Sequence, residues 1–144
     1  MNFFSQIFSN KVLAISMFAC FLAQFIKIFT GKDKFMQFSR LFTSGGMPSS
    51  HSAVVVSLAT LIGRENGFGS SIFALSVIFA FVVMYDAAGV RRAAGKQAKL
   101  LNKLIETPGL TGVQVSEKLV EVLGHTPFQV FVGAIIGIIV GCIF

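Results

Sequence analysis

Four long apolar segments constrain this chain more than any other feature. The 144 residues are 54% hydrophobic, only 12% are charged, and the mean hydropathy is +0.80. Ordinary soluble domains carry about twice this charged fraction. A helix that crosses a bilayer needs about 20 mostly apolar residues. The sequence therefore predicts an all-α integral membrane protein, one domain over 1–144, with about four transmembrane helices at about 12–29, 48–62, 71–90 and 128–144.

The second of these segments leaves an alternative open. It is short and its start is polar, which is typical of segments that enter a membrane without crossing it. A re-entrant segment here would leave three spans and move the C-terminus to the cytoplasm. The first segment is interpreted as a span and not as a signal peptide, because no small-residue cleavage site followed by a soluble domain comes after it.

The basic residues predict an orientation. Ten of the twelve lysine and arginine residues lie after the first or third span, or at the end of the first span. The other two, Lys11 and Arg64, lie on the other side of the membrane in this layout. Positively charged loops stay in the cytoplasm. Both termini are therefore expected outside and both basic loops in the cytoplasm, a layout that suits a bacterial plasma membrane.

The stretch Gly45–Ser52 carries the strongest functional signal. Its sequence is Gly-Gly-Met-Pro-Ser-Ser-His-Ser, and an apolar helical run follows. Pro48 suits the first position of a helix, which places Ser49, Ser50 and His51 around the first turn. Backbone N–H groups and the helix dipole favour an anion there, and a histidine can move protons near neutral pH. A phosphate site at the mouth of a membrane helix is predicted.

Asp86 needs a partner or a role, because it lies inside the third apolar segment. An unpaired ionised carboxylate there costs at least roughly 2.5 kcal/mol. On an unbroken helix, Arg91 and Arg92 lie well away from it around the axis, although a break at Gly89 would change this. The alternatives are a pair with either histidine or with a group on another span.

The candidate site residues share one predicted membrane face. The catalytic candidates are His51, His125 and Asp86. The phosphate-binding candidates are Lys34, Arg40, Ser49, Ser50, Arg91 and Arg92. Each has a structural alternative: a hydrogen-bonded histidine, a charge pair, or a cation that anchors a span end. No metal-ligand spacing or cofactor-binding motif occurs, so neither a metal nor a cofactor is expected.

The long loop, about 91–127, begins with a basic amphipathic helix. Arg92, Lys96, Lys99 and Lys103 follow helical spacing, and apolar residues occupy another face. Such a helix is expected on the membrane surface beside anionic lipids, although its basic end could instead draw in an anionic substrate. A short helix is expected at 113–123 and Gly124 to end it. Membrane lipids explain this charge, so nucleic acid is not expected as a partner.

A glycine stripe runs along the last span. Gly133, Gly137 and Gly141 repeat every four residues, which allows another helix to approach closely. The partner is either another span of this chain or a second copy, which would make a homo-oligomer. Cys20 and Cys142 lie in apolar runs and are interpreted as small packing residues.

Three segments together resemble the divergent branch of the type 2 phosphatidic acid phosphatase family, which is related to acid phosphatases and vanadium-dependent haloperoxidases. They are Gly45–Ser52, then 85–98, which reads Tyr-Asp-Ala-Ala-Gly-Val-Arg-Arg-Ala-Ala-Gly-Lys-Gln-Ala, and 123–127, which reads Leu-Gly-His-Thr-Pro. With the span layout, the resemblance covers nearly the whole chain. It implies a lipid-phosphate phosphatase in which His51 protonates the leaving alcohol, Asp86 orients a histidine, and the phosphate oxygens are held by Arg91, Arg92 and Lys34.

The chain departs from the mainstream pattern of this family, in which the lysine and arginine of the first motif are further apart than Lys34 and Arg40, and in which the aspartate follows the arginines whereas Asp86 precedes them. Ser50 replaces the glycine of Pro-Ser-Gly-His, Leu41 replaces the proline of Arg-Pro, and no histidine follows the arginines where the family has its nucleophile. His125 would then replace that nucleophile from another segment, or His51 would change role. Two hypotheses follow: a phosphomonoesterase or phosphotransferase acting on lipid phosphates at the cytoplasmic face, or a non-catalytic protein that binds anionic lipid or phosphate or stabilises a membrane complex.

Overall fold

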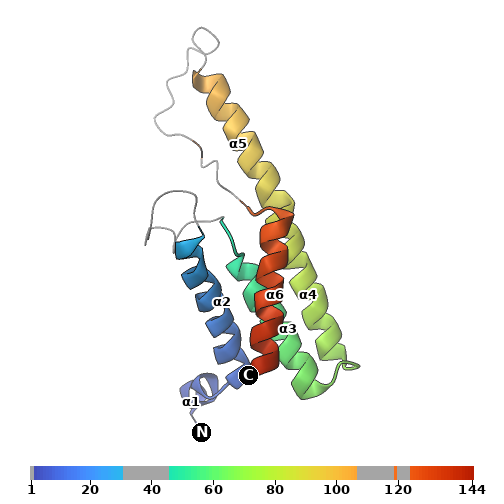
Figure 1. Ribbon diagram of the computed structural model, residues 1–144. Helices are drawn as coiled ribbons and strands as arrows, with labels where there is room; N and C mark the ends of the chain where they lie inside the picture. The colour runs from blue at the N-terminus through green and yellow to red at the C-terminus, as the bar shows by residue number, and fades with distance from the viewer. Residues whose placement is uncertain (1, 31–45, 107–118, 120–123) are drawn as a thin grey trace.

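The computed structural model describes residues 2–30, 46–106, 119 and 124–144, and in these residues all regular structure is helical (Figure 1). The helices are α1 (Phe3–Phe8), α2 (Lys11–Phe29), α3 (Ser50–Asn66), α4 (Ser71–Ala88), α5 (Val90–Glu106) and α6 (Pro127–Ile143). The four apolar segments predicted from the sequence correspond to α2, α3, α4 and α6. The predicted helix at 113–123 lies outside the described residues.

Side-chain caps explain where the long helices begin. The side chains of Asn10, Ser49 and Ser70 each accept a hydrogen bond from the backbone N–H three residues later. At α6, Thr126 and Gln129 form a reciprocal capping box, and Pro127 occupies the first turn. Such caps satisfy N–H groups that the helix itself leaves without partners.

Helices α2, α3, α4 and α6 form an up-and-down bundle (Figure 1). Both termini lie at one end of it. At the other end of the bundle, α2 and α4 finish and α3 and α6 begin. This end carries His51 and His125 and is called the histidine end. Helix α3 is one continuous helix that packs along α6 and α2. The described residues therefore show no re-entrant hairpin in the second segment.

The glycine stripe of α6 packs against α3 of the same chain. A Cβ atom at Gly133 would stand 2.3 Å from the Ser49 carbonyl oxygen, and one at Gly137 would stand 2.6 Å from that of Ala53. Gly141 faces the side chain of Thr60, whose Cβ atom would lie 2.7 Å from a Cβ atom at this glycine. Of the two partners expected from the sequence, the structure thus shows the span of the same chain. The stripe is covered by α3, so these glycines do not offer a surface to a second copy.

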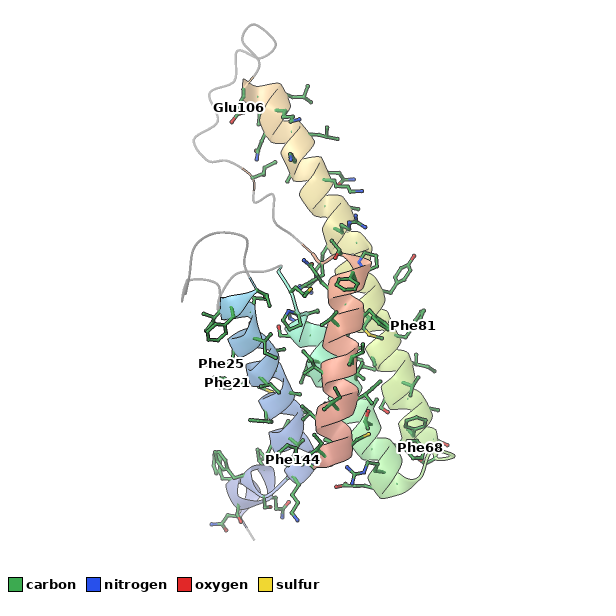
Figure 2. All side chains as sticks on the ribbon, in the orientation of Figure 1. Phe21, Phe25, Phe68, Phe81, Glu106 and Phe144 are labelled. Carbon is green, nitrogen blue, oxygen red and sulfur yellow. The ribbon has the colours of Figure 1, made fainter. Side chains whose placement is uncertain are left out.

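Small side chains form the interior and large ones point outward. The buried centre contains Ala19, Ala23 and Ala53 with Val140, whereas aromatic side chains of α2 and α4 such as Phe21, Phe25 and Phe81 are exposed (Figure 2). In the part of the chain that the structure describes, two segments are long and apolar enough to cross a membrane: α2, and Ser71–Glu106, which comprises α4 and α5. The apolar α6 is shorter. An apolar exterior around a small-residue interior is what a lipid environment favours.

Helix α5 differs in placement from the sequence-based expectation. It begins directly after Gly89, where the backbone leaves helical geometry, and continues in roughly the direction of α4, beyond the bundle (Figure 1). Among the described helices it packs only against α4. If α4 crosses a bilayer, this direction carries α5 away from the membrane surface on which the amphipathic pattern places it.

Candidate functional site

The start of α3 is fixed to the start of α6 by backbone contacts. The sequence predicted Pro48 as the first residue of the helix, but in the structure Ser49 is the N-cap and the helix begins at Ser50. Pro48 is therefore one residue outside the cap. The backbone N–H of Ser49 donates to the carbonyl oxygen of Gln129 at 3.1 Å. Because Gly133 leaves room for the same serine's carbonyl group, the two helix starts lie side by side.

The serines of this turn point inward. Ser49, Ser50 and Ser52 are all buried, and the Ser52 hydroxyl donates to that of Ser49 at 3.0 Å. The Ser49 hydroxyl also accepts from the Ser52 backbone N–H at 3.4 Å. His51, by contrast, is exposed. Ser49 is thus engaged in capping the helix, and His51 is the side chain of this turn that can meet a ligand.

His125 lies at the start of α6 and is buried, with 6% of its surface exposed. Its backbone N–H donates to the carbonyl oxygen of Ala87 at 2.9 Å, while neither ring nitrogen has a hydrogen-bond partner in the described structure. Burial lowers the pKa of His125 to about 4, and the positive charges of Lys27, His51 and Arg91 act in the same direction. The imidazole is therefore neutral at neutral pH, with a nitrogen lone pair available.

The backbone before His125 explains its position. Gly124 has φ +87°, a conformation that favours glycine. A Cβ atom there would stand 2.5 Å from the backbone nitrogen of Arg92. Only a residue without a side chain allows the segment before α6 to pass this close to the start of α5.

Lys27 is a member of the site that the sequence reasoning missed. It lies in the last turn of α2 with 3% of its surface exposed, and its aliphatic stem packs on Gly46, whose Cβ position is 3.5 Å from three of its carbons. Its charge acts on both His51 and His125. Its spacing in the sequence could have predicted its burial, because Lys27 continues the four-residue repeat of Ala19 and Ala23 on the inner face of α2.

Asp86 pairs with Arg91 across the break between α4 and α5. The Nε atom of Arg91 lies 2.6 Å from the Asp86 carboxylate, and both side chains are partly exposed. Gly89 ends α4, so the break that the sequence left open does occur. The carboxylate makes no hydrogen bond to either histidine in the described structure, although its charge and that of Arg91 both act on His51.

The structure thus brings most of the candidates together at the histidine end. His51, His125 and Lys27 come from three different helix ends, and the Asp86–Arg91 pair joins them from a fourth. Arg92 is exposed next to Gly124, and Ser50 is buried in the first turn of α3. The phosphate-binding candidates Lys34 and Arg40 lie outside the described residues. Within the described ranges, no group of three or more potential metal ligands occurs.

These features define a helical membrane protein with two histidines and several cations gathered at one end of its bundle. The sequence pattern of the Divergent PAP2 family matches residues 8–140. The chain is also 40% identical to the uncharacterized membrane protein YuiD of Bacillus subtilis (strain 168), and the alignment covers 93% of each protein. No solved structure matches it. The chain belongs to the Divergent PAP2 family, which confirms the resemblance seen in its motifs.

Proposed function

We propose that this protein is a membrane phosphatase or phosphotransferase that acts on lipid phosphates at the histidine end. The observation that carries the proposal is the convergence of His51, His125 and Lys27 from helix ends far apart in the sequence. Two histidines provide for both nucleophilic attack and proton transfer. The nearby cations suit the charge of a phosphate group.

The chemistry divides between the two histidines. The neutral His125 attacks phosphorus through a ring nitrogen, and the bond from phosphorus to the leaving oxygen breaks. A protonated His51 donates its proton to that oxygen, which releases the lipid alcohol. Water then attacks the phosphohistidine and gives inorganic phosphate, while a second alcohol in place of water gives transfer. Lys27, Arg91 and the other basic candidates stabilise the phosphoryl oxygens.

The membrane layout belongs to the same proposal. The four bundle helices span the bilayer, with the histidine end in the cytoplasm and both termini outside. In support, Lys27, Arg91 and Arg92 lie at the histidine end, whereas Lys11 and Arg64 lie at the other end. This distribution agrees with the positive-inside rule. The bacterial relative suggests a bacterial plasma membrane.

The test is phosphate release from lipid phosphomonoesters by the purified protein in nanodiscs. His51→Ala and His125→Leu are expected to abolish release without loss of folded protein, whereas Lys11→Gln, which removes a cation at the opposite end, retains it. Acid-labile, alkali-stable phosphate retained on the wild-type chain and absent from His125→Leu would identify the nucleophile. Full activity in both histidine variants would overturn the mechanism.

One observation favours a second candidate, a protein that binds anionic lipid or phosphate without turnover. Asp86, which the enzyme hypothesis needs to orient a histidine, instead forms an ion pair with Arg91. The second candidate predicts saturable binding of lipid phosphate that requires Lys27 and His51, with no phosphate released from any ester. Turnover by a clean preparation would exclude it.

A further inference from the structure

Helix α5 exposes an apolar strip that nothing in the described structure covers. Leu100, Leu101 and Leu104 are 63%, 48% and 48% exposed, and Val90 at the start of the helix is also exposed. On a helix of 3.6 residues per turn these side chains share one face. An uncovered strip of this kind marks a surface that meets a partner.

A second face of α5 is basic. Lys96 and Lys99 are exposed on it, and Arg92 and Lys103 follow the same spacing. Glu106 is the acidic residue of the helix, at its last position. A strongly basic face and a separate apolar strip on one helix are typical of a helix that lies in the interface of an anionic bilayer.

Leu119 contacts a third face of α5. Gly95, Ala98 and Asn102 are the buried residues of α5. The side chain of Asn102 donates to the carbonyl oxygen of Leu119 at 2.9 Å and accepts from its N–H at 3.0 Å. This contact is turned away from the leucines, so Leu119 leaves the apolar strip open.

We propose that α5 docks its apolar strip onto an anionic lipid surface by bending at Gly89. The bilayer that surrounds α4 is the nearest apolar phase, and its anionic headgroups complement the basic face. A second copy of α5 complements it poorly, since two such helices would bring lysines together. The bend falls between Asp86 and Arg91, whose partly exposed ion pair resists rearrangement only weakly. The proposal is independent of any catalytic activity.

A single tryptophan tests the docking, because the chain contains none. Leu101→Trp is placed in nanodiscs of phosphatidylcholine with brominated acyl chains, with or without phosphatidylglycerol. With the anionic lipid we expect strong quenching and a shift of the emission to shorter wavelength. Phe81→Trp, exposed on α4 (Figure 2), is the control and is quenched in both lipids. Leu104→Trp provides a second reporter if Leu101→Trp does not fold.

The charge dependence completes the test. Lys96→Gln with Lys99→Gln is expected to weaken docking of the reporter roughly 30-fold, since each lysine near an anionic surface contributes about a factor of five. The matched pair Lys11→Gln with Arg64→Gln, at the other end of the bundle, leaves docking unchanged. A reporter that remains unquenched in anionic nanodiscs overturns the proposal. A blue shift that appears in detergent and grows with protein concentration also overturns it, and indicates a second copy as the partner.

Discussion

The backbone N–H of His125 donates to the carbonyl oxygen of Ala87 at 2.9 Å, which joins the start of α6 to the end of α4. This bond places His125 beside Ala87, the residue that follows Asp86 in the sequence. It also brings His125 close enough to Arg91 for the positive charge of Arg91 to lower the pKa of the histidine. Backbone contacts of this kind, together with the bond from Ser49 to Gln129, assemble the histidine end from segments that are distant in the sequence. Its geometry is therefore set by the fold and not by local motifs.

The buried His125 makes stability depend on pH in a defined direction. Its pKa is lowered from 6.5 to about 4, so the fold favours the neutral ring. This contribution is complete above pH 6.5 and is lost as the pH falls toward 4, by on the order of 3 kcal/mol. His125→Leu removes the titration, so its melting temperature should fall less than that of the wild type over this range. Parallel curves for the two proteins would contradict the pKa shift.

His125→Leu should also separate function from stability. The two ring nitrogens are buried without hydrogen-bond partners, and buried polar groups of this kind are costly. At pH 7 the variant is therefore expected to melt at or above the wild-type temperature while losing phosphate release or lipid-phosphate binding. A strongly destabilised variant would show that the ring supports the fold.

Lys27→Met tests the cation that the sequence reasoning missed. Methionine preserves an unbranched apolar side chain against Gly46 and removes the charge. We expect inorganic phosphate or a lipid phosphate to bind about 10- to 100-fold more weakly, the range for loss of a hydrogen bond to a charged group. Ligand-induced thermal stabilisation measures the effect, and Lys11→Met at the opposite end is the control. If the ligand stabilises Lys27→Met and Lys11→Met equally, Lys27 does not contribute to phosphate binding.

The sequence predicted the helices well because their signals are local. Apolar runs depend on neighbours within a few positions, and the structure confirms the helices that these runs indicate. Lys27 was missed because it interrupts an apolar run and fits the positive-inside rule, so its charge already had an explanation. Its burial depends on Gly46 passing over its stem, a contact between distant segments that no local pattern encodes.

The partner of Asp86 also could not be predicted from the local sequence pattern. The sequence left Arg91, a histidine and another span as alternatives, because the answer depended on whether Gly89 continues the helix. A Cβ atom at Gly89 would stand 2.9 Å from the Tyr85 carbonyl oxygen. The break at this position then turns Arg91 toward the carboxylate. Backbone geometry at one residue thus decided which side chains meet.

Gly133→Ala should destabilise the bundle. The new methyl group would stand 2.3 Å from the Ser49 carbonyl oxygen, and a backbone atom held by a helix cannot move aside easily. The expected cost is about 1–3 kcal/mol, measured as a lower melting temperature in detergent. Gly69→Ala is the matched control, since its methyl group would meet no atom within 4 Å. Equal melting temperatures for the two variants would show that α3 and α6 do not pack this closely.

Asp86→Asn distinguishes a charge pair from a catalytic positioning group. Because both members of the Asp86–Arg91 pair are partly exposed, its loss should cost at most about 1 kcal/mol of stability. If Asp86 only holds Arg91, kcat for phosphate release should fall by less than about tenfold, while Arg91→Gln should lower it by about 10²- to 10³-fold through loss of charge stabilisation. A fall on the order of 10⁴-fold in Asp86→Asn, comparable to loss of the carboxylate that orients a catalytic histidine, would instead show that Asp86 turns toward a histidine during the reaction. Steady-state kinetics of the two variants, each with an unchanged melting temperature, decides between these roles.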